Sequence, residues 1–526
     1  MTITELQQRY AAHPNTAVME RLLKDVSVQT IFCGGLCASS ASLFSSVLVK
    51  QDVCPFVFVL GDLEEAGYFY HDLTQILGTE KVLFFPSSFR RSIKYGQKDA
   101  ANEILRTEVL SRLQKGEEGL CIVTYPDALA EKVVSRKELS DKTLKLNVGE
   151  KLDTTFITDV LHSYGFEYVD YVYEPGQYAV RGSIIDVFSF ASEYPYRIDF
   201  FGDEVESIRT FEVESQLSRE KKEGVAIVPD LAVTGEVTTS FLDFIPKETI
   251  LAMRDFLWLR ERIQVVHDEA LTPQAIAVQE AEENGGITLE GKLIDGSEFT
   301  VRALDFRRME FGNKPTGTPD ASITFSTAVQ PIFHKNFDLV AGSFKDYLEQ
   351  GYSLYICSDS TKQTDRIKAI FEDRGDKIQF TPVERTIHEG FVDHTLHLCV
   401  FTDHQLFDRF HKYNLKSDKA RSGKVALSLK ELNQFTPGDY VVHTDHGIGR
   451  FSGLVRIPNG DTTQEVLKLV FQNEDVVFVS IHSLHKVSKY KGKDGEAPRL
   501  NKLGTGAWEK LKDRTLSLIH ISEPTR

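Results

Sequence analysis

The sequence predicts a multidomain α/β protein with an inserted β-rich module, a second small α/β domain and a small β-barrel near its C-terminal end. Its first part alternates short apolar runs with helical segments, which is typical of a parallel sheet buried on both faces. Two later stretches, at about 150–225 and 433–492, are rich in β-branched and aromatic residues and carry frequent turn signals. A length of 526 residues fits about three to five domains at roughly 100–200 residues each.

Residues 1–145 predict the first part of a parallel α/β body. Ile104, Leu105, Val109 and Leu113 follow helical spacing between two of the expected strands. The expected buried strands are TIFCGG at 30–35, FVFVL at 56–60, VLFF at 82–85 and LCIVT at 120–124.

The pattern changes at about residue 150. Residues 150–225 predict a small antiparallel module with turns at Pro175-Gly176 and Gly202-Asp203. Strand and helix character returns over 226–335, which we interpret as a second part of the body. The helix–strand–helix pattern at 344–374 and the buried run at 396–403 then predict a small α/β domain at 336–412.

A polar connector follows at 413–432, and together with Lys412 just before it this stretch carries six cations. We expect a solvated linker or helix there. Residues 433–492 then predict four or five short antiparallel strands. Such strands must close to protect their edges, so we expect an SH3-like or Tudor-like barrel. Residues 493–515 follow as a further connector.

Composition excludes several classes of protein. The net charge of −16 argues against a surface that grips nucleic acid everywhere, so any contact with DNA should be local. The sequence shows neither a long uncharged apolar stretch nor a basic segment followed by an apolar one at its start. We therefore expect a cytoplasmic protein without a membrane contact. The six cysteines lie mostly in apolar runs and are interpreted as small buried side chains rather than as disulfides.

A glycine-rich turn follows the first expected strand, where a strand, a turn and a helix start could hold phosphate. It includes Gly34, Gly35, Ser39 and Ser40, but from Gly34 onward the first lysine is Lys50. A working P-loop needs a lysine for the β- and γ-phosphates. We therefore predict a degenerate, non-functional loop and expect no cofactor here; a nucleotide-binding enzyme stays open only if this loop nevertheless binds ATP.

The remaining groups of histidine, serine, cysteine and acidic residues predict neither a catalytic site nor a metal site. His443-x-x-His446 and His482-x-x-His485 could suggest zinc, but on a strand such pairs point to opposite faces. We expect these histidines to bond backbone in tight turns. No Ser/His/Asp or Cys/His pattern stands out, so recognition surfaces remain the best candidates.

Three such surfaces stand out. In the β module, guanidinium groups and aromatic rings occur together, as in many protein–protein hot spots: Arg181, Arg197, Arg209, Tyr178, Phe201 and Phe211. Alternation would place some of these aromatic rings in the core. In the barrel, Ile457 beside the Pro458-Asn459-Gly460 turn is suited to strand addition. After the barrel, a basic patch could meet a DNA backbone or simply end a helix; it comprises Lys486, Lys489, Lys491 and Lys493.

Two long motifs carry a family resemblance. EPGQYAVRGSIIDVFSFASEYPYRIDFFGDEVESIRTFEVESQLS at 174–218 closely resembles the UvrB-like module of nucleotide excision repair. PGDYVVHTDHGIGRFSGL at 437–454, with SLHKVSKYKG and LNKLGTGAWEKLK, resembles the CarD-like barrel that interacts with RNA polymerase. This order of motifs is typical of the bacterial transcription-repair coupling factor family (Mfd), and the resemblance extends to about residue 515.

The resemblance implies a UvrB-like, helicase-like body without ATPase activity and a UvrA-binding module. It carries the UvrA contacts onto Arg181, Arg197 and Phe201, and the contact with the polymerase β subunit onto the strand around Arg456 and Ile457. The family recognises RNA polymerase stalled at damage, displaces it by ATP- and magnesium-dependent translocation on double-stranded DNA, and recruits UvrA. It also implies that a C-terminal domain covers the UvrA surface.

This sequence departs from the family after about residue 512. The family continues into an ATP-dependent DNA translocase, whereas LSLIHISEPTR at 516–526 fits no continuing helix and is interpreted as a non-native tail. We therefore expect a monomeric fragment that carries the recruiting surfaces without the motor. A CarD-type transcription regulator and a UvrB-like DNA-loading protein are the alternatives. The second would need an intact Gly-Lys-Thr loop near residue 40.

Overall fold

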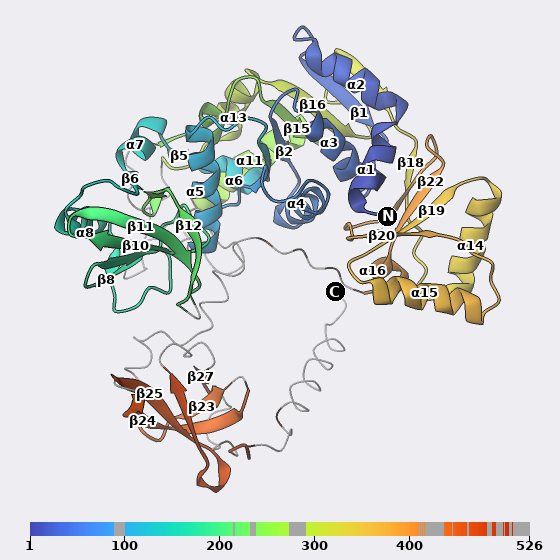
Figure 1. Ribbon diagram of the computed structural model, residues 1–526. Helices are drawn as coiled ribbons and strands as arrows, with labels where there is room; N and C mark the ends of the chain where they lie inside the picture. Colours follow the sequence, from blue (N-terminus) through green and yellow to red (C-terminus); the bar gives the residue numbers. More distant parts are fainter. Residues whose placement is uncertain are drawn as a thin grey trace. The chain divides into compact units, whose positions relative to one another are not determined.

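The computed structural model confirms a mixed α/β multidomain architecture (Figure 1). It describes residues 1–526 except 89–99, 214–215, 232–237, 273–290, 410, 412, 414, 416–435, 444, 460–461, 481–486, 491–497, 499, 504–507 and 509–526. The chain divides into two compact units, Met1–Thr143 with Val228–Lys416 and Leu144–Ile227 with Ser417–Arg526. The β module therefore begins at Leu144, before the expected boundary at 150.

The body is built on a seven-stranded sheet in the order β17-β1-β16-β15-β2-β4-β3. Every neighbouring pair in this sheet is parallel. The central strands are buried along their whole length, which explains why their sequences show apolar runs without alternation. The strands are β1 (Thr30–Gly34), β2 (Phe56–Val59), β3 (Val82–Phe84), β4 (Cys121–Thr124), β15 (Ile250–Met253), β16 (Arg307–Gly312) and β17 (Ala321–Thr324).

Helices surround this sheet (Figure 1). Asp62, Asp255 and Asp295 each precede a helix and accept a backbone N–H of its first turn, which fixes where these helices begin. The helical spacing predicted between 104 and 113 is confirmed in α5. The helices are α1 (Ile3–Ala11), α2 (Pro14–Lys24), α3 (Ser40–Gln51), α4 (Leu63–Leu77), α5 (Ala100–Gln114), α6 (Pro126–Ala130), α7 (Arg136–Asp141), α10 (Phe241–Phe244), α11 (Phe256–Ala270) and α13 (Gly296–Ala303). A short pair, β5 (Val133–Val134) with β14 (Thr238–Thr239), completes the body.

The small α/β domain has a five-stranded sheet in the order β18-β21-β22-β19-β20. Its apolar core includes Phe344, Ile356, Ile367 and Phe401, drawn from helices and strands alike. The predicted helix–strand–helix segment is confirmed. The elements are β18 (Thr327–Val329), α14 (Phe337–Glu349), β19 (Ser353–Ser358), α15 (Thr361–Asp373), β20 (Thr381–Glu384), β21 (Phe391–Asp393), β22 (Leu398–Thr402) and α16 (Asp403–Leu406).

The β module contains a six-stranded sheet in the order β12-β11-β10-β9-β8-β7, together with the pair β6–β13 and helix α8. Helix α8 packs Ile157 and Leu161 into a core with Ile185, Ile198 and Ile208 of the sheet. The elements are β6 (Leu144–Asn147), α8 (Thr154–Ser163), β7 (Glu167–Tyr168), β8 (Gln177–Arg181), β9 (Ile184–Val187), β10 (Tyr196–Phe201), β11 (Glu204–Phe211), β12 (Ser218–Lys222) and β13 (Gly224–Ile227).

The barrel has five strands, within the predicted four or five, in the antiparallel order β26-β25-β24-β23-β27. Each strand contributes to one apolar core, which includes Val441, Phe451, Leu467, Val479 and Val487. The elements are β23 (Tyr440–His443), β24 (Gly447–Asn459), β25 (Thr462–Val470), the 3₁₀ turn η2 (Gln472–Glu474), β26 (Val476–Ser480) and β27 (Val487–Lys489).

Candidate functional site

One face of the β-module sheet carries a row of charged side chains, which we call the arginine face: Arg181, Asp186, Arg197, Asp199 and Arg209. Arg197 on β10 is directly opposite Asp186 on β9 and Arg209 on β11. Because side chains alternate along a strand, these residues share the face opposite the one on which α8 packs. The row crosses four strands, β8 to β11.

Two arginines share the single buried carboxylate of Asp186. The Arg197 guanidinium contacts it twice, from Nε to Oδ1 at 2.8 Å and from Nη2 to Oδ2 at 2.8 Å. Arg181 pairs with the same carboxylate, whose residue is fully buried. The hydrogen bond to Asp186 holds the pKa of Arg197 above its ordinary value. A buried charge needs such partners, so this arrangement keeps both guanidinium groups in place.

Arg197 is held from other sides as well. It donates to the Gln216 carbonyl at 3.1 Å, and its guanidinium carbon lies 4.5 Å from the centre of the Phe211 ring. Arg209 pairs with Asp199 at 2.6 Å. Three arginines thus face two aspartates, and the row has an excess of positive charge.

Phe201 stands at the end of β10, next to the turn between β8 and β9. Its side chain is 79% exposed, the largest exposed fraction among the described large hydrophobic residues. The backbone N–H of Phe200 donates to the carbonyl of Ser183 at 2.9 Å, so the end of β10 lies beside the chain just after Arg181. The structure therefore brings the predicted Arg181, Arg197 and Phe201 to one part of the module.

Two other aromatic candidates are not surface anchors. Phe211 is fully buried and Tyr178 is 6% exposed, so both belong to the packing of the module. Asp186, by contrast, was not predicted. Its signal is an aspartate within the apolar run Ile184-Ile185-Asp186-Val187, because a carboxylate on a buried strand requires a cationic partner.

The glycine-rich loop between β1 and α3 forms the predicted strand–turn–helix. Gly35 has φ +83°, and a Cβ there would lie 2.1 Å from the Phe325 carbonyl oxygen, so packing alone requires this glycine. The hydroxyl of Thr327 donates to the Gly35 carbonyl at 2.6 Å and accepts from the Cys37 N–H at 3.2 Å. The Cys37 N–H and the Gly35 carbonyl of this loop therefore form hydrogen bonds within the protein, and this N–H is not available to a phosphate.

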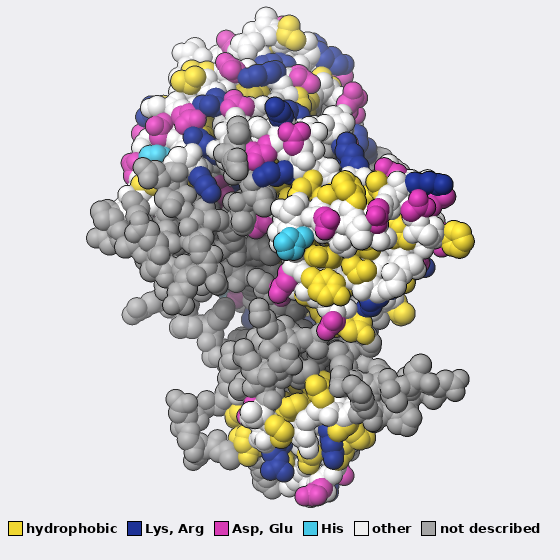
Figure 2. All heavy atoms as spheres, turned by 90° about the vertical axis from the view of Figure 1, so that its left-hand side faces the viewer, with side chains coloured by type: hydrophobic (Ala, Val, Ile, Leu, Met, Phe, Trp, Pro, Cys, Tyr) yellow, Lys and Arg dark blue, Asp and Glu magenta, His cyan; other side chains and the backbone are white. Residues whose placement is uncertain are grey.

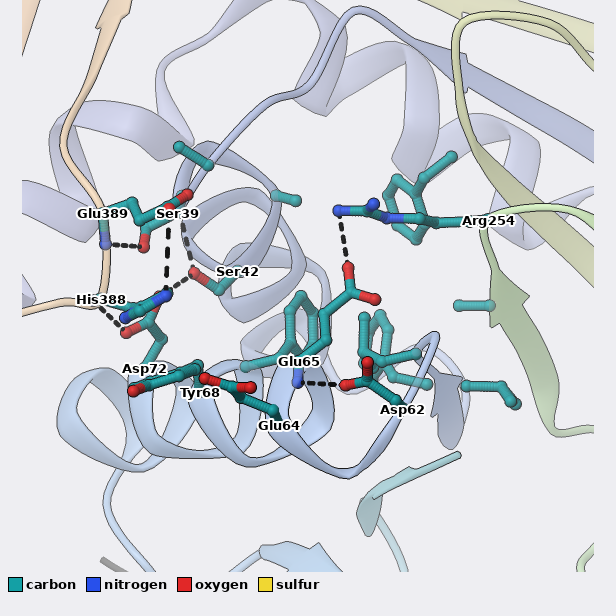
Figure 3. A pocket seen from close by; sticks show the side chains of 18 of the residues that line it. Ser39, Ser42, Asp62, Glu64, Glu65, Tyr68, Asp72, Arg254, His388 and Glu389 are labelled. Carbon is teal, nitrogen blue, oxygen red and sulfur yellow. Dashed lines mark hydrogen bonds and ion pairs between the residues drawn. The ribbon is translucent and has the colours of Figure 1, made fainter. Parts of the chain in front are cut away.

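The loop at 386–390 of the small domain lies against the start of α3 (Figure 3). The backbone N–H of Glu389 donates to Ser39 Oγ at 2.9 Å. The backbone N–H of His388 donates to the carboxylate of Asp72 at 2.7 Å, and Ser42 Oγ donates to the same carboxylate at 2.7 Å. Burial raises the pKa of Asp72 to about 6.

A cavity of about 360 Å³ opens beside this loop. Five carboxylates line it, and the one lining arginine, Arg254, pairs with Glu65 at 2.6 Å. The acidic lining residues are Asp62, Glu64, Glu65, Asp72 and Glu389. Such a lining repels a triphosphate, so these residues do not fit ATP with magnesium.

We therefore predict that the purified chain does not bind ATP at this loop. Equilibrium dialysis with radiolabelled ATP and magnesium should show no saturation up to about 1 mM nucleotide. Hydrolysis should stay at background when double-stranded DNA is added, with a P-loop ATPase as the positive control. Saturable binding that is lost in a Ser39→Glu variant would contradict the prediction.

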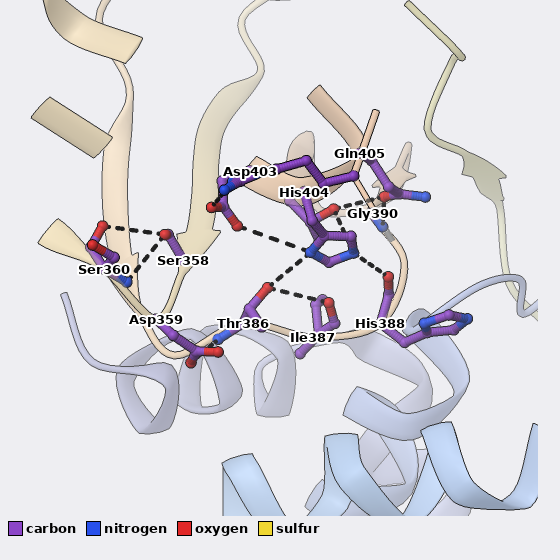
Figure 4. Close-up of polar contacts among 12 residues, drawn as sticks. Ser358, Asp359, Ser360, Thr386, Ile387, His388, Gly390, Asp403, His404 and Gln405 are labelled. Atoms are coloured by element: carbon purple, nitrogen blue, oxygen red, sulfur yellow. Dashed lines mark hydrogen bonds and ion pairs between the residues drawn. The ribbon is translucent and has the colours of Figure 1, made fainter. Parts of the chain in front are cut away.

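A histidine cluster lies where the small domain contacts the body: His71, His388, His404 and His411. The His388 ring stacks on Tyr68 with centroids 3.5 Å apart, and the His404 and His411 rings stack at 4.4 Å. His404 Nε2 donates to the His388 carbonyl at 2.7 Å, and Figure 4 shows its ring between Thr386 and Asp403. Burial lowers the pKa of His71 and His388 to about 4 and that of His404 to about 3.

The barrel candidates can be placed only in part. Arg456 and Ile457 lie in β24, opposite Glu465 and Gln464 of β25. Their side chains lie outside the described residues, as do Lys486, Lys491, Lys493 and the side chain of Lys489.

One expectation about the barrel was wrong. The rings of His443 and His446 do not point apart but stack at 4.5 Å, because β23 ends at His443 and the chain turns. His443 Nδ1 accepts the N–H of Asp445 at 3.1 Å, as expected for a histidine that bonds backbone in a tight turn. His482 and His485 lie outside the described residues.

The described part of the chain contains no cluster of metal ligands and no membrane-spanning helix. No group of three or more histidine, cysteine, aspartate or glutamate side chains there could hold a metal ion. None of the described helices has the length and apolar character needed to cross a membrane. All six cysteines are free, and four of them are buried, in line with their interpretation as core residues.

Comparisons with known proteins match two regions of this chain to family models. Residues 144–232 match the UvrB interaction domain, and residues 435–491 match the CarD-like/TRCF RID domain. A transcription-repair-coupling factor of Staphylococcus aureus (strain bovine RF122 / ET3-1) is 24% identical over 91% of this chain and 46% of its own length. That of Bacillus subtilis (strain 168) is 23% identical, with shares of 91% and 47%. The chain spans about half the length of the curated relatives it matches.

Proposed function

We propose that this chain, which corresponds to the N-terminal region of the transcription-repair coupling factor family, recruits proteins for transcription-coupled nucleotide excision repair. In this proposal the β module binds UvrA and the barrel binds the β subunit of RNA polymerase. The observation that carries it is the arginine face, with its excess of positive charge beside the exposed Phe201.

The chemistry of the arginine face suits a protein partner. Arginine and large aromatic side chains dominate protein–protein hot spots, and Arg181 and Arg197 are held in place before any partner arrives. Preorganised side chains lose less conformational entropy on binding. The match of this region to the UvrB interaction domain supports a repair protein as the partner.

The barrel supports the second half of the proposal through its family match. Ile457 lies on β24 close to the turn into β25, and an apolar residue type at the end of a strand suits the addition of that strand to a partner's sheet. In longer members of the family, we propose, a motor outside this sequence translocates on DNA and displaces the stalled polymerase. The acidic cavity beside Ser39 supports a body that does not use ATP itself, and it argues against a UvrB-like DNA loader.

Loss of the arginine face should weaken UvrA binding. Arg181→Ala and Phe201→Ala are each expected to reduce affinity by about 2 kcal/mol or more, close to 30-fold, if these residues are hot spots. Biolayer interferometry with immobilised UvrA would measure this change. Arg302→Ala and Val301→Ala on α13 are matched controls, because they remove a paired arginine and an exposed apolar side chain from the body. Unchanged affinity in both module variants would show that the surface is misplaced.

A charge at the barrel hairpin should abolish polymerase binding. Ile457→Arg would place a cation in an apolar contact, and we expect at least a 30-fold loss of affinity for the β subunit, about 2 kcal/mol. Co-purification with RNA polymerase would test this, with Ile457→Val as the conservative variant and Val301→Arg as the control for added charge. Equal binding by Ile457→Arg and the unmodified chain would reject the assignment.

A further inference from the structure

A second surface of the β module lies on the side of the sheet opposite the arginine face. Helix α8 buries Ile157 and Leu161, yet Phe156 is 51% exposed. Val160 and Tyr164 are half-buried and follow Phe156 at successive intervals of four residues. Residues at this spacing lie on one side of a helix, so the three form an apolar stripe about 12 Å long. Phe156 is its exposed end, and Tyr164, which directly follows the last residue of α8, packs partly against the core of the module.

Tyr168 on β7 extends this stripe. It is 59% exposed, and its ring meets the Tyr178 ring edge-on with centroids 5.5 Å apart. The pKa of Tyr178 is raised mainly by burial, and further by Tyr168 and by the Asp159 carboxylate of α8. Asp159 is exposed and follows Phe156 by three residues, so the two are neighbours on the surface of α8. We call the surface formed by Phe156, Asp159, Val160, Tyr164 and Tyr168 the α8 patch.

The surroundings of the α8 patch are acidic. Asp153 begins α8 and Asp170 follows Tyr168 by two residues, whereas no lysine or arginine occurs from 152 to 180. Figure 2 shows hydrophobic side chains gathered on the module with acidic ones beside them. In the described part of the chain none of Asp153, Asp159 and Asp170 has an ion-pair partner, in contrast to Asp186 and Asp199 of the arginine face.

We propose that the α8 patch is a docking site for a cationic amphipathic helix of a partner protein. An apolar stripe of two helical turns fits the apolar side of such a helix, and the carboxylates of Asp159 and Asp170 fit lysine or arginine on its flanks. The site is separate from the arginine face, because the two lie on opposite sides of one sheet. A cationic partner could therefore bind the α8 patch while a different partner occupies the arginine face.

The probe for this site is an amphipathic helical peptide of about 15 residues made of leucine and lysine. A peptide with glutamate in place of lysine is the control. Fluorescence anisotropy with the full chain should show saturable binding of the lysine peptide, weakened by added salt because the charge pairs are exposed. Equal binding of both peptides, or of neither, would overturn the proposal.

Variants locate the binding. Phe156→Ser and Asp159→Lys should each weaken the lysine peptide at least tenfold, whereas Phe201→Ser on the other side of the sheet should leave it unchanged. Asp159→Asn keeps the shape of the side chain and should give a smaller loss in the same direction. Equal loss in Phe201→Ser, or no loss in the α8 variants, would overturn the proposal. So would concentration-dependent dimerisation abolished by Phe156→Ser, because the occupant would then be a second copy.

Discussion

Replacement of Asp186 by alanine is expected to lower the unfolding free energy of the β module by about 3–5 kcal/mol, because it leaves two arginines without their shared carboxylate. Arg197 suffers most, since its side chain is only 15% exposed and cannot recover full hydration. Protection against hydrogen–deuterium exchange in β9 and β10 of the full chain would report this loss locally.

Two further variants make the test specific. Asp199→Ala removes the more exposed pair with Arg209, and its expected effect is about 1 kcal/mol or less. Asp186→Asn keeps an acceptor but loses the charge, so its effect should fall between the two alanine variants. If Asp186→Ala is no more disruptive than Asp199→Ala, Asp186 is not the organising residue of the arginine face. If the proposed function is correct, UvrA affinity falls in parallel with the loss of order.

Acidification is expected to loosen the contact between the small domain and the body. The pKa values of His71 and His388 are about 4 and that of His404 about 3 in the folded protein, against an ordinary value of 6.5. The unfolded chain therefore binds more protons below pH 6.5. The stability from these neutral histidines is fully present above pH 6.5 and is lost as the pH falls toward 4.

The size of this loss of stability depends on how many more protons the unfolded chain binds than the folded protein. Each histidine contributes about 1.4 kcal/mol per pH unit in this window at most. Solvent screening reduces the contribution of His388 to this loss of stability, because its side chain is 31% exposed. Asp72 acts in the opposite direction, because its folded pKa of about 6 lies above its ordinary value of 3.8. It adds stability as the pH falls from 6 to 3.8, but one such group does not offset three histidines.

Hydrogen–deuterium exchange of the 382–390 segment at pH 7, 6 and 5, corrected for intrinsic rates, would measure this loosening. His404→Gln keeps a donor for the His388 carbonyl and should flatten the dependence on pH. His162→Gln, on the exposed side of α8, should not change it. Protection that is constant from pH 7 to pH 5 would contradict the prediction.

Local sequence patterns predicted most helices and strands correctly, because apolar runs, helical spacing and turn residues act over short stretches of the chain. The uniform apolar runs at 56–60 and 120–124 became β2 and β4, which are buried throughout. The barrel strands followed from their turns and β-rich composition. The prediction failed at His443 and His446. The strand β23 ends at His443 instead of continuing through His446, and the two rings stack.

The candidate site was predicted in part. Residue type and resemblance selected Arg181, Arg197 and Phe201, but they did not indicate that the first two share one carboxylate. The same reasoning offered Tyr178 and Phe211, which pack in the core. An arginine or an aromatic ring is compatible with either location, and only the register of neighbouring strands assigns each side chain to a face.

The sequence by itself determined the fold class, the β module, a further module of four or five antiparallel strands and the lack of a lysine in the glycine-rich loop. Only the tertiary structure decided that 386–390 lies on the start of α3, that Asp72 accepts from His388, and that four histidines gather at this contact. The physical reason is distance along the chain. More than 300 residues separate Asp72 from His388, so no local periodicity reports their contact, and packing of the 386–390 loop against the start of α3 and against α4 brings them together.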